Sequence, residues 1–134
     1  MSVRGETPGI VTTGLGYDCH RFAAGRRLVL GGVELSHDRG LEGHSDADVL
    51  THAIIDGLLG AAALGDIGQH FPDTDPRWKN ASSQQFLVHA RNLLRQQGFE
   101  LVSVDATVIL ERPKLNEYRY DMREKLAAAL ELEV

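Results

Sequence analysis

The chain has 134 residues and a formal net charge of −5, from 14 lysines and arginines against 19 aspartates and glutamates. This balance argues against nucleic-acid binding, which normally uses a basic face, and no apolar run reaches the roughly 18 residues of a membrane span. The single cysteine, Cys19, excludes an internal disulfide and is typical of a reducing compartment. We expect one cytoplasmic domain over residues 1–134, with residues 1–9 as a flexible lead. For a plant or algal source the plastid stroma is the alternative, although no transit peptide is seen.

Two strands are predicted in the first third of the chain. Residues 10–20 predict the first strand, which contains two glycines. Residues 28–35 form a second run, in which the Gly31-Gly32 pair indicates a bulge or a tight bend. The polar residues 36–43 that follow predict a loop.

A long helix is expected next, from a capping residue at Ser45 to about Leu64, with Asp48 as an acidic partner in a capping box. Its apolar stripe repeats at four-residue spacing through Leu50, Ile54 and Leu58. Gly57 and Gly60 each weaken a helix by about 1 kcal/mol relative to alanine, so we expect another segment to pack closely there.

The second half predicts a loop, a helix, a strand and a last helix. Residues 65–78 are dense in glycine, proline and aspartate. A helix is expected from Ser82 to Gly98, an alternating strand over residues 99–110, and a helix over residues 116–130. The order β-β-α-α-β-α favours an α+β fold in which helices cover one face of a mixed sheet.

Asp18 and His20 stand two apart on the first predicted strand, so their side chains share one face while that of Cys19 points away. His52 lies in the first predicted helix, with Asp48 and Asp56 one turn before and after it. Carboxylate and neutral imidazole are zinc ligands, and a helical acid can orient His52. Three such ligands leave a fourth tetrahedral position open, as in catalytic zinc sites, where a phosphate oxygen can bind.

These patterns also have plainer interpretations. An Asp-x-His pair on a strand is common by chance, and an isolated helical histidine is usually a satisfied interior or surface residue. The row of Asp48, His52 and Asp56 also suits a solvated helix stripe. Cys19, on the opposite face, is expected to be a small buried hydrophobe. Spacing alone therefore does not decide between a zinc site and these plainer interpretations.

His44 precedes the expected cap Ser45, beside a helix N-terminus whose free N–H groups favour an anion. The two residues therefore predict a phosphate pocket, with a simple helix cap as the alternative. Lys114 follows Pro113 at the end of a predicted strand, where it would meet a phosphate or lie in solvent. No comparable group surrounds the remaining histidines, His37, His70 and His89.

Three separated runs, GYDCHRF, GHSDADVLTHAIIDGLLGAAALGDIGQHFPDTDP and VDATVILERPKL, resemble the 2-C-methyl-D-erythritol 2,4-cyclodiphosphate synthase family over about residues 11–130. The resemblance implies a ferredoxin-like two-layer sandwich that forms a homotrimer, with active sites between subunits. It implies a phosphorus–oxygen lyase that converts 4-diphosphocytidyl-2-C-methyl-D-erythritol 2-phosphate to the cyclodiphosphate and CMP. The 2-phosphate attacks the β-phosphate in this step of the non-mevalonate isoprenoid pathway.

The resemblance also implies site residues. It assigns Asp18, His20 and His52 to Zn²⁺, places a second divalent ion, Mg²⁺ or Mn²⁺, on the substrate diphosphate, and makes His44 the transition-state stabiliser. The implied substrate-binding residues are Asp18, Cys19, His20, His44, Ser45, Asp56, Asp66, Ile67, Gly68, Phe71, Pro72, Asp73, Thr74 and Asp75. The implied cytidine pocket, from a neighbouring subunit, is Leu110, Glu111, Arg112, Pro113, Lys114, Leu115 and Asn116.

One feature departs from the family. Its members continue past the last helix with a further strand and a clamp for the nucleotide phosphates, whereas this sequence stops at Val134. The missing clamp favours, as an alternative, a trimer that binds the ligand without turnover. A zinc phosphohydrolase with a water in the open coordination position is a separate alternative.

Overall fold

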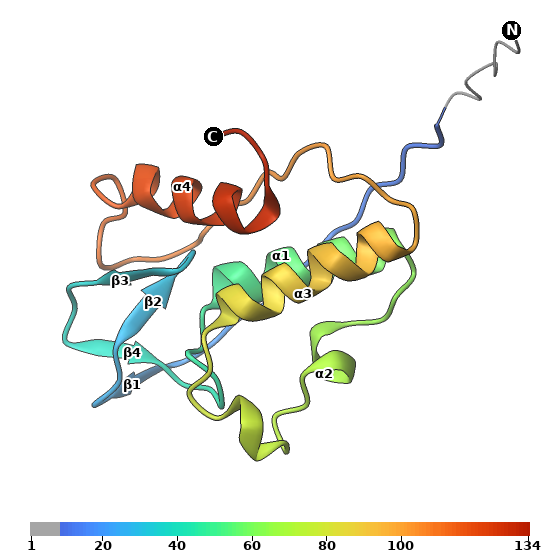
Figure 1. Cartoon of the computed structure of the whole chain (residues 1–134). Coiled ribbons are helices and arrows are strands. Elements are labelled where there is room, and N and C mark those ends of the chain that lie inside the picture. The colour runs from blue at the N-terminus through green and yellow to red at the C-terminus, as the bar shows by residue number, and fades with distance from the viewer. Residues whose placement is uncertain (1–8) are drawn as a thin grey trace, which may run out of the picture.

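The computed structural model describes residues 9–134, so the predicted lead lies outside them except for Gly9. Figure 1 shows short strands gathered at one end of the molecule and the helices α1 and α3 lying side by side. The elements in chain order are β1 (Phe22–Ala24), β2 (Leu28–Leu30), β3 (Val33–Leu35), β4 (Arg39–Leu41), α1 (Val49–Ala61), α2 (Ile67–His70), the 3-10 helix η1 (Pro76–Trp78), α3 (Ser83–Gln96) and α4 (Arg119–Leu130). The α+β class is confirmed.

The strands form two antiparallel pairs rather than the predicted mixed sheet. The run 28–35 is a hairpin, because Gly31 and Gly32 have φ values of 56° and 76°, a region that favours glycine, and turn the chain between β2 and β3. The bend was predicted, but the two separate strands were not. β4 lies in the predicted loop 36–43 and pairs with β1.

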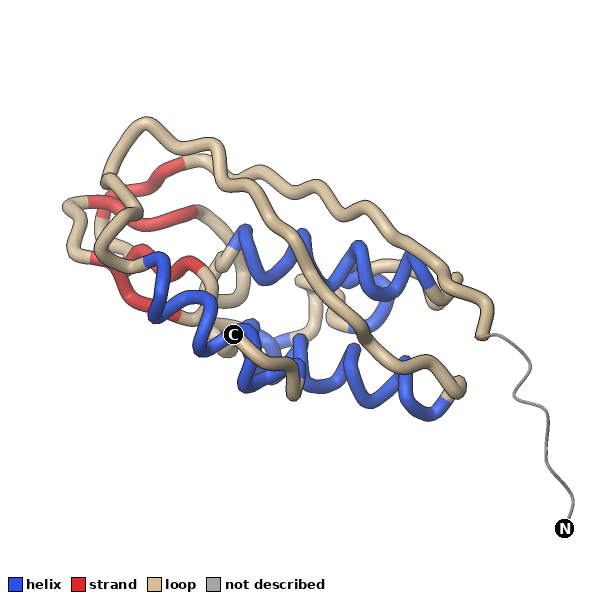
Figure 2. The backbone as a smooth tube through the Cα atoms, turned by 90° about the horizontal axis from the view of Figure 1, so that it is seen from above, coloured by secondary structure: helices blue, strands red, loops and turns tan. Residues whose placement is uncertain are grey.

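The predicted strands 10–20 and 99–110 are extended segments that form no β-ladder within the described part of the chain. Figure 2 shows them as two long tan segments on the same side of the helices. A cavity of about 1260 Å³ is lined by both segments and by α1 and β2. Alternation predicted the extended backbone, but a strand also needs a hydrogen-bonded neighbour, which each segment lacks here.

The observed helix boundaries differ from the predicted ones at several positions. α1 begins at Val49, four residues after Ser45, because its N-cap is Asp48, and it ends at Ala61. α2 and η1 occupy the predicted loop 65–78, and α4 begins at Arg119 rather than residue 116. The start of α3 is confirmed, with Ser82 as the cap.

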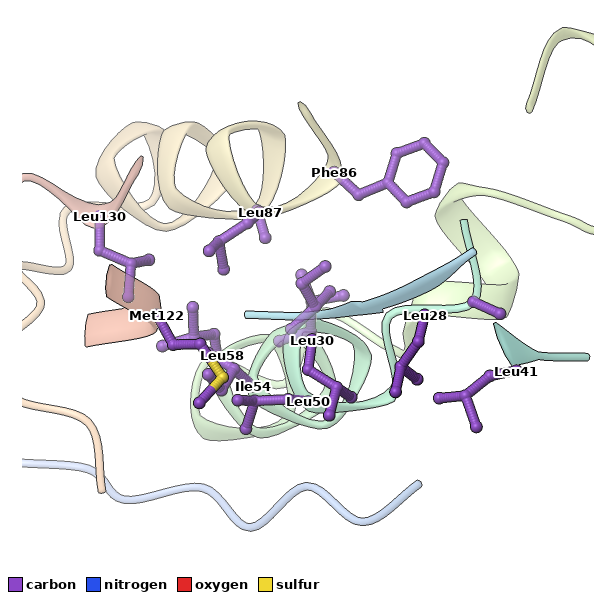
Figure 3. Close-up of a cluster of buried hydrophobic side chains, with 14 of the residues drawn as sticks. Leu28, Leu30, Leu41, Leu50, Ile54, Leu58, Phe86, Leu87, Met122 and Leu130 are labelled. Carbon is purple, nitrogen blue, oxygen red and sulfur yellow. The ribbon is translucent and has the colours of Figure 1, made fainter. Parts of the chain in front are cut away.

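The core lies between α1, α3, α4 and the β2–β3 hairpin. Figure 3 shows side chains from these elements meeting. The predicted apolar stripe of α1 is buried, as are leucines from β2 and α3 and three residues of α4. The labelled members of this cluster are Leu28, Leu30, Leu41, Leu50, Ile54, Leu58, Phe86, Leu87, Met122 and Leu130.

Asp48 ties this core together. Its fully buried carboxylate accepts hydrogen bonds from the N–H groups of Gly31, Gly32 and Thr51, at 2.7–3.0 Å, and from the Thr51 hydroxyl. Burial raises the pKa of the Asp48 carboxyl, and the four donors act in the opposite direction. One side chain thus caps α1 and anchors the turn of the β2–β3 hairpin.

We expect Asp48→Ala to lower the free energy of unfolding by about 3 kcal/mol or more, since it removes a cap and leaves buried N–H donors unpaired. Urea unfolding measures the change. Asp38→Ala is the control, because the Asp38 side chain is 80 % exposed, and it should change stability by less than about 0.5 kcal/mol. Equal stability of the two variants would contradict this role for Asp48.

Candidate metal centre

The candidate ligands come from two segments that touch directly. Residues 10–21 lie against α1 because Gly14 and Gly16 carry no side chain: a Cβ on either would stand 1.8 or 1.7 Å from a carbonyl oxygen of the helix. On the helix side, a Cβ on Gly57 would lie 3.2 Å from the Gly16 nitrogen, which confirms the close packing predicted there. The same prediction for Gly60 is wrong, since a Cβ built there would point into open space.

Asp18, His20 and His52 converge where these segments meet. The Asp18 Oδ2 atom lies 2.9 Å from His20 Nε2 and 3.3 Å from His52 Nδ1. Ligand atoms of all three residues lie within 4.8 Å of one another. The predicted shared face of Asp18 and His20 is confirmed. Cys19 points away as predicted, but it is exposed rather than buried, because no element covers that side of the segment.

The donor set suits zinc. Tetrahedral zinc with bonds of about 2.0–2.1 Å separates its ligand atoms by about 3.3 Å, close to the two separations made by Asp18 Oδ2. His20 Nδ1 donates to the Glu42 carbonyl at 2.6 Å, so Nε2 is the ring nitrogen that faces the cluster and, in the neutral ring, offers a lone pair to a metal. One carboxylate and two imidazoles are therefore preorganised to bind a divalent metal.

The charges agree with this arrangement. Burial alone would raise the pKa of Asp18, but hydrogen bonds with His20 and His52 outweigh it and hold that pKa well below its usual range. The hydrogen bond with Asp18 raises the pKa of His20. Asp18 is thus a carboxylate at neutral pH, the form that binds a metal.

His52 and its two acidic neighbours on α1 are not a solvated stripe. Asp48 is fully buried, His52 is 9 % exposed and Asp56 is half-buried. Only His52 joins the metal group, because Asp48 is committed to the hairpin and Asp56 accepts the Ile67 N–H at 2.8 Å. Neither acid orients His52, contrary to the hypothesis from their spacing.

Ser45, which follows His44, lies next to the metal group, but neither residue is at a helix N-terminus. Ser45 Oγ is 3.3 Å from His52 Nε2, and His44 Nε2 donates to the Asp75 carbonyl at 2.9 Å. The predicted pocket of helix amides is wrong, since α1 begins four residues after Ser45 and its first turn is capped by Asp48. The Ser45 side chain instead borders the cluster from the preceding loop, and the His44 ring is held by Asp75.

The implied substrate loop after α1 is ordered by its own contacts. Asp56 anchors the start of α2, Asp66 caps that helix, and Phe71 stacks on Phe86 with ring centroids 4.2 Å apart. Phe71 is therefore packed against the core. The other implied residues of this stretch are half-buried or exposed: Ile67, Gly68, Pro72, Asp73, Thr74 and Asp75.

Residues 110–116, the implied cytidine pocket, form the connection before α4. Among the described residues, no hydrogen bond joins this segment to Asp18, His20 or His52. Lys114 is exposed to solvent, which was the simpler of the two interpretations of this residue. A single chain thus leaves this segment without a polar link to the metal group.

Two residues next to the metal group, Ser83 and Asp46, were not predicted from the sequence. Ser83 Oγ lies 2.7 Å from His52 Nε2, and Ser83 also donates to the Asp46 carboxylate. The only sequence signal for Ser83 is the pair Ser82-Ser83 at the start of α3. Ser82 alone caps the helix, so Ser83 is free for another role. Nothing in the spacing connects Ser83 with His52.

Fold and site together define a small α+β domain with a carboxylate–imidazole group suited to a divalent metal. None of its helices, within the described residues, has the length and apolarity needed to cross a bilayer. The sequence matches the YgbB family over residues 11–134, and the chain belongs to that family.

Named relatives agree with this membership. The chain is 62 % identical over 124 residues to the 2-C-methyl-D-erythritol 2,4-cyclodiphosphate synthase of Solibacter usitatus, covering 92 % of this chain and 78 % of the relative. A solved 2C-methyl-D-erythritol-2,4-cyclodiphosphate synthase has a TM-score of 0.85 at 41 % identity, over 90 % of this chain and 81 % of that one. The IspF–CDP complex of Plasmodium falciparum has a TM-score of 0.77 at 31 % identity, with coverages of 91 % and 74 %. The resemblance seen in the motifs is confirmed.

Proposed function

We propose that this chain converts 4-diphosphocytidyl-2-C-methyl-D-erythritol 2-phosphate to 2-C-methyl-D-erythritol 2,4-cyclodiphosphate and CMP, a step in isoprenoid biosynthesis. The convergence of Asp18, His20 and His52, in a chain 62 % identical to a synthase of that name, carries the proposal. Residues 1–134 then form a single domain of this enzyme, a phosphorus–oxygen lyase of the non-mevalonate pathway.

The reaction needs no protein nucleophile. An oxygen of the 2-phosphate forms a bond to the β-phosphorus, and the bond from that phosphorus to the oxygen of the cytidylate phosphate breaks. CMP leaves with the electron pair. Holding the two reacting groups in line can lower the barrier of such an internal attack by roughly 7–11 kcal/mol. The task of the chain is therefore to bring two repelling phosphates together.

Asp18, His20 and His52 would hold Zn²⁺, and a second divalent ion, Mg²⁺ or Mn²⁺, would bind with the substrate diphosphate. Metal bound there supplies Lewis acidity and positive charge to substrate phosphate oxygens. This local charge matters because the chain itself carries a net charge of −5. The ionised Asp18 and the Glu42 carbonyl that orients the His20 ring support the assignment.

His44 and Ser45 are proposed to contact the 2-phosphate beside the metal group. The Asp75 carbonyl holds the His44 ring by accepting from Nε2, so a ring protonated on Nδ1 as well can donate to a phosphate oxygen. Asp56 and the stretch around α2 are proposed to line the erythritol part, with the contact between Asp56 and Ile67 fixing that loop. Cys19 is proposed to contribute through its backbone, since its thiol faces outward.

We propose a homotrimer in which Leu110–Asn116 of a neighbouring subunit supplies the cytidine pocket. The CDP bound in the Plasmodium falciparum relative supports a cytidine nucleotide as ligand. Large apolar side chains exposed on the two extended segments support an interface, as such patches usually mark one. They are Ile10, Val11, Leu15, Tyr17, Val102 and Ile109. A ferredoxin-like sandwich and a cytoplasmic location, which the free thiol of Cys19 favours, belong to the same proposal.

Incubation of the full chain with the authentic substrate, Zn²⁺ and Mg²⁺ tests the function. We expect CMP, measured by chromatography, and the cyclodiphosphate, measured by ³¹P NMR, in equal amounts. His44→Ala should lower kcat about 10²–10³-fold, as does loss of one transition-state donor elsewhere, and should leave the zinc content unchanged. CMP with an open-chain phosphate product would indicate a hydrolase. Binding of CDP without turnover would indicate a ligand-binding trimer.

A further inference from the structure

Ser83 joins the metal group to a second carboxylate. It is the first residue of α3 and is fully buried. Its Oγ lies 2.7 Å from His52 Nε2 and 2.5 Å from Asp46 Oδ1. The Ser83 N–H also donates to Asp46 Oδ2 at 2.9 Å, so both Asp46 oxygens are engaged by one residue. The start of α3 is thereby fixed behind the His52 ring.

The direction of these hydrogen bonds follows from the number of protons. A carboxylate only accepts, and Asp46 Oδ1 already accepts the Asp48 N–H at 3.1 Å. The single hydroxyl hydrogen of Ser83 therefore goes to Asp46, and Ser83 Oγ can only accept from His52. His52 Nε2 must carry a hydrogen, so in the neutral ring Nδ1, which faces Asp18, keeps the lone pair that a metal would take.

Ser45 does not do the same work. Its Oγ is 3.3 Å from His52 Nε2, 0.6 Å further away than that of Ser83, and it also accepts the Ala47 N–H. The hydrogen bond from His52 Nε2 to Ser83 Oγ is the shorter of the two, and the Asp46 carboxylate that accepts from the Ser83 hydroxyl strengthens it.

The two metal-binding histidines are held differently. His20 is oriented by the main-chain carbonyl of Glu42, which no side-chain substitution removes. His52 depends on a hydroxyl contributed by another helix. A single side-chain substitution can therefore remove the hydrogen bond that orients His52, but not the one that orients His20.

We propose that Ser83 and Asp46 are positioning residues that hold His52 in the tautomer and ring orientation that bind metal through Nδ1. The proposal rests on the metal site of the proposed function and deepens it. Outer hydrogen-bond partners of this kind typically change metal affinity by 10–100-fold. The set Asp46–Ser83–His52 thus couples the packing of α3 on α1 to the affinity of the site.

Zinc affinity and the histidine tautomer test the proposal. Competition with a chromophoric chelator should show zinc bound about 10–100-fold more weakly by Ser83→Ala than by the wild type. Ser83→Thr, which keeps a hydroxyl, should restore most of the affinity. Ser82→Ala is the matched control, because Ser82 caps the same helix through Gln84 and does not contact His52. It should bind zinc as tightly as the wild type.

The tautomer is read directly from ¹⁵N spectra of the histidine rings in the zinc-loaded wild type, which involves no substitution. We expect a protonated Nε2 and a zinc-bound Nδ1 on His52. The opposite tautomer, or unchanged zinc affinity in Ser83→Ala, would overturn the proposal. If zinc binds as expected and the wild type releases no CMP, the proposed function fails while this proposal stands.

Discussion

The His52→Ala variant is expected to lose its bound zinc and about a thousand-fold or more of its turnover. The ring is one of the three proposed protein ligands, and its Nδ1 lies 3.3 Å from Asp18 Oδ2. Metal ions contribute several kcal/mol of transition-state charge stabilisation, and each 1.36 kcal/mol corresponds to about a factor of ten. Elemental analysis gives the zinc content, and CMP release gives the rate.

His89→Ala is the matched control for this variant. His89 lies on α3, is exposed, and is not part of the metal group. It should keep one zinc per chain and wild-type turnover. Full zinc retention in His52→Ala would contradict the assignment of His52 as a zinc ligand.

Gly16→Ala should destabilise the fold and weaken zinc binding together. The added Cβ would stand 1.7 Å from the Ala53 carbonyl oxygen, so the segment must move away from α1. Overpacking of this kind typically costs about 1–3 kcal/mol. Because Asp18 and His20 follow two and four residues later, the same movement separates them from His52. Urea unfolding of the metal-free chain and chelator competition measure the two effects.

Gly60→Ala tests the same substitution on a free surface. No atom lies within 4 Å of a Cβ at this position of α1, so the variant should gain about 0.5–1 kcal/mol of stability from helix propensity. Zinc affinity should not change. A Gly16→Ala protein that matches the wild type in both measurements would contradict the close packing of the segment on α1.

The pairs of residues that local geometry governs could be predicted. Asp18 and His20 share a face because side chains alternate along any extended backbone, whether or not a ladder forms. The apolar stripe of α1 was readable because helical spacing needs no knowledge of the partner. His52 could be placed on α1, but only the fold shows that it meets Asp18, since glycines at positions 14 and 16 decide how close the segment comes.

The predictions that were wrong or missing concern residues whose roles depend on tertiary contacts, which the local sequence pattern does not specify. Ser45 and Asp48 both suit a helix cap, and the choice of Asp48 follows from the Gly31-Gly32 turn, which offers it two more donors. Residues 99–110 alternate correctly, yet no strand pairs with them in the described chain. Ser83 reaches His52 only because α3 packs on α1.

The most direct test of the metal centre is anomalous X-ray scattering from crystals of the wild-type chain, measured on both sides of the zinc absorption edge. We predict one difference peak per chain, about 2.0–2.2 Å from His20 Nε2, His52 Nδ1 and an Asp18 oxygen. A zinc peak bound by other residues, or the absence of a peak from zinc-supplemented crystals, would contradict the account.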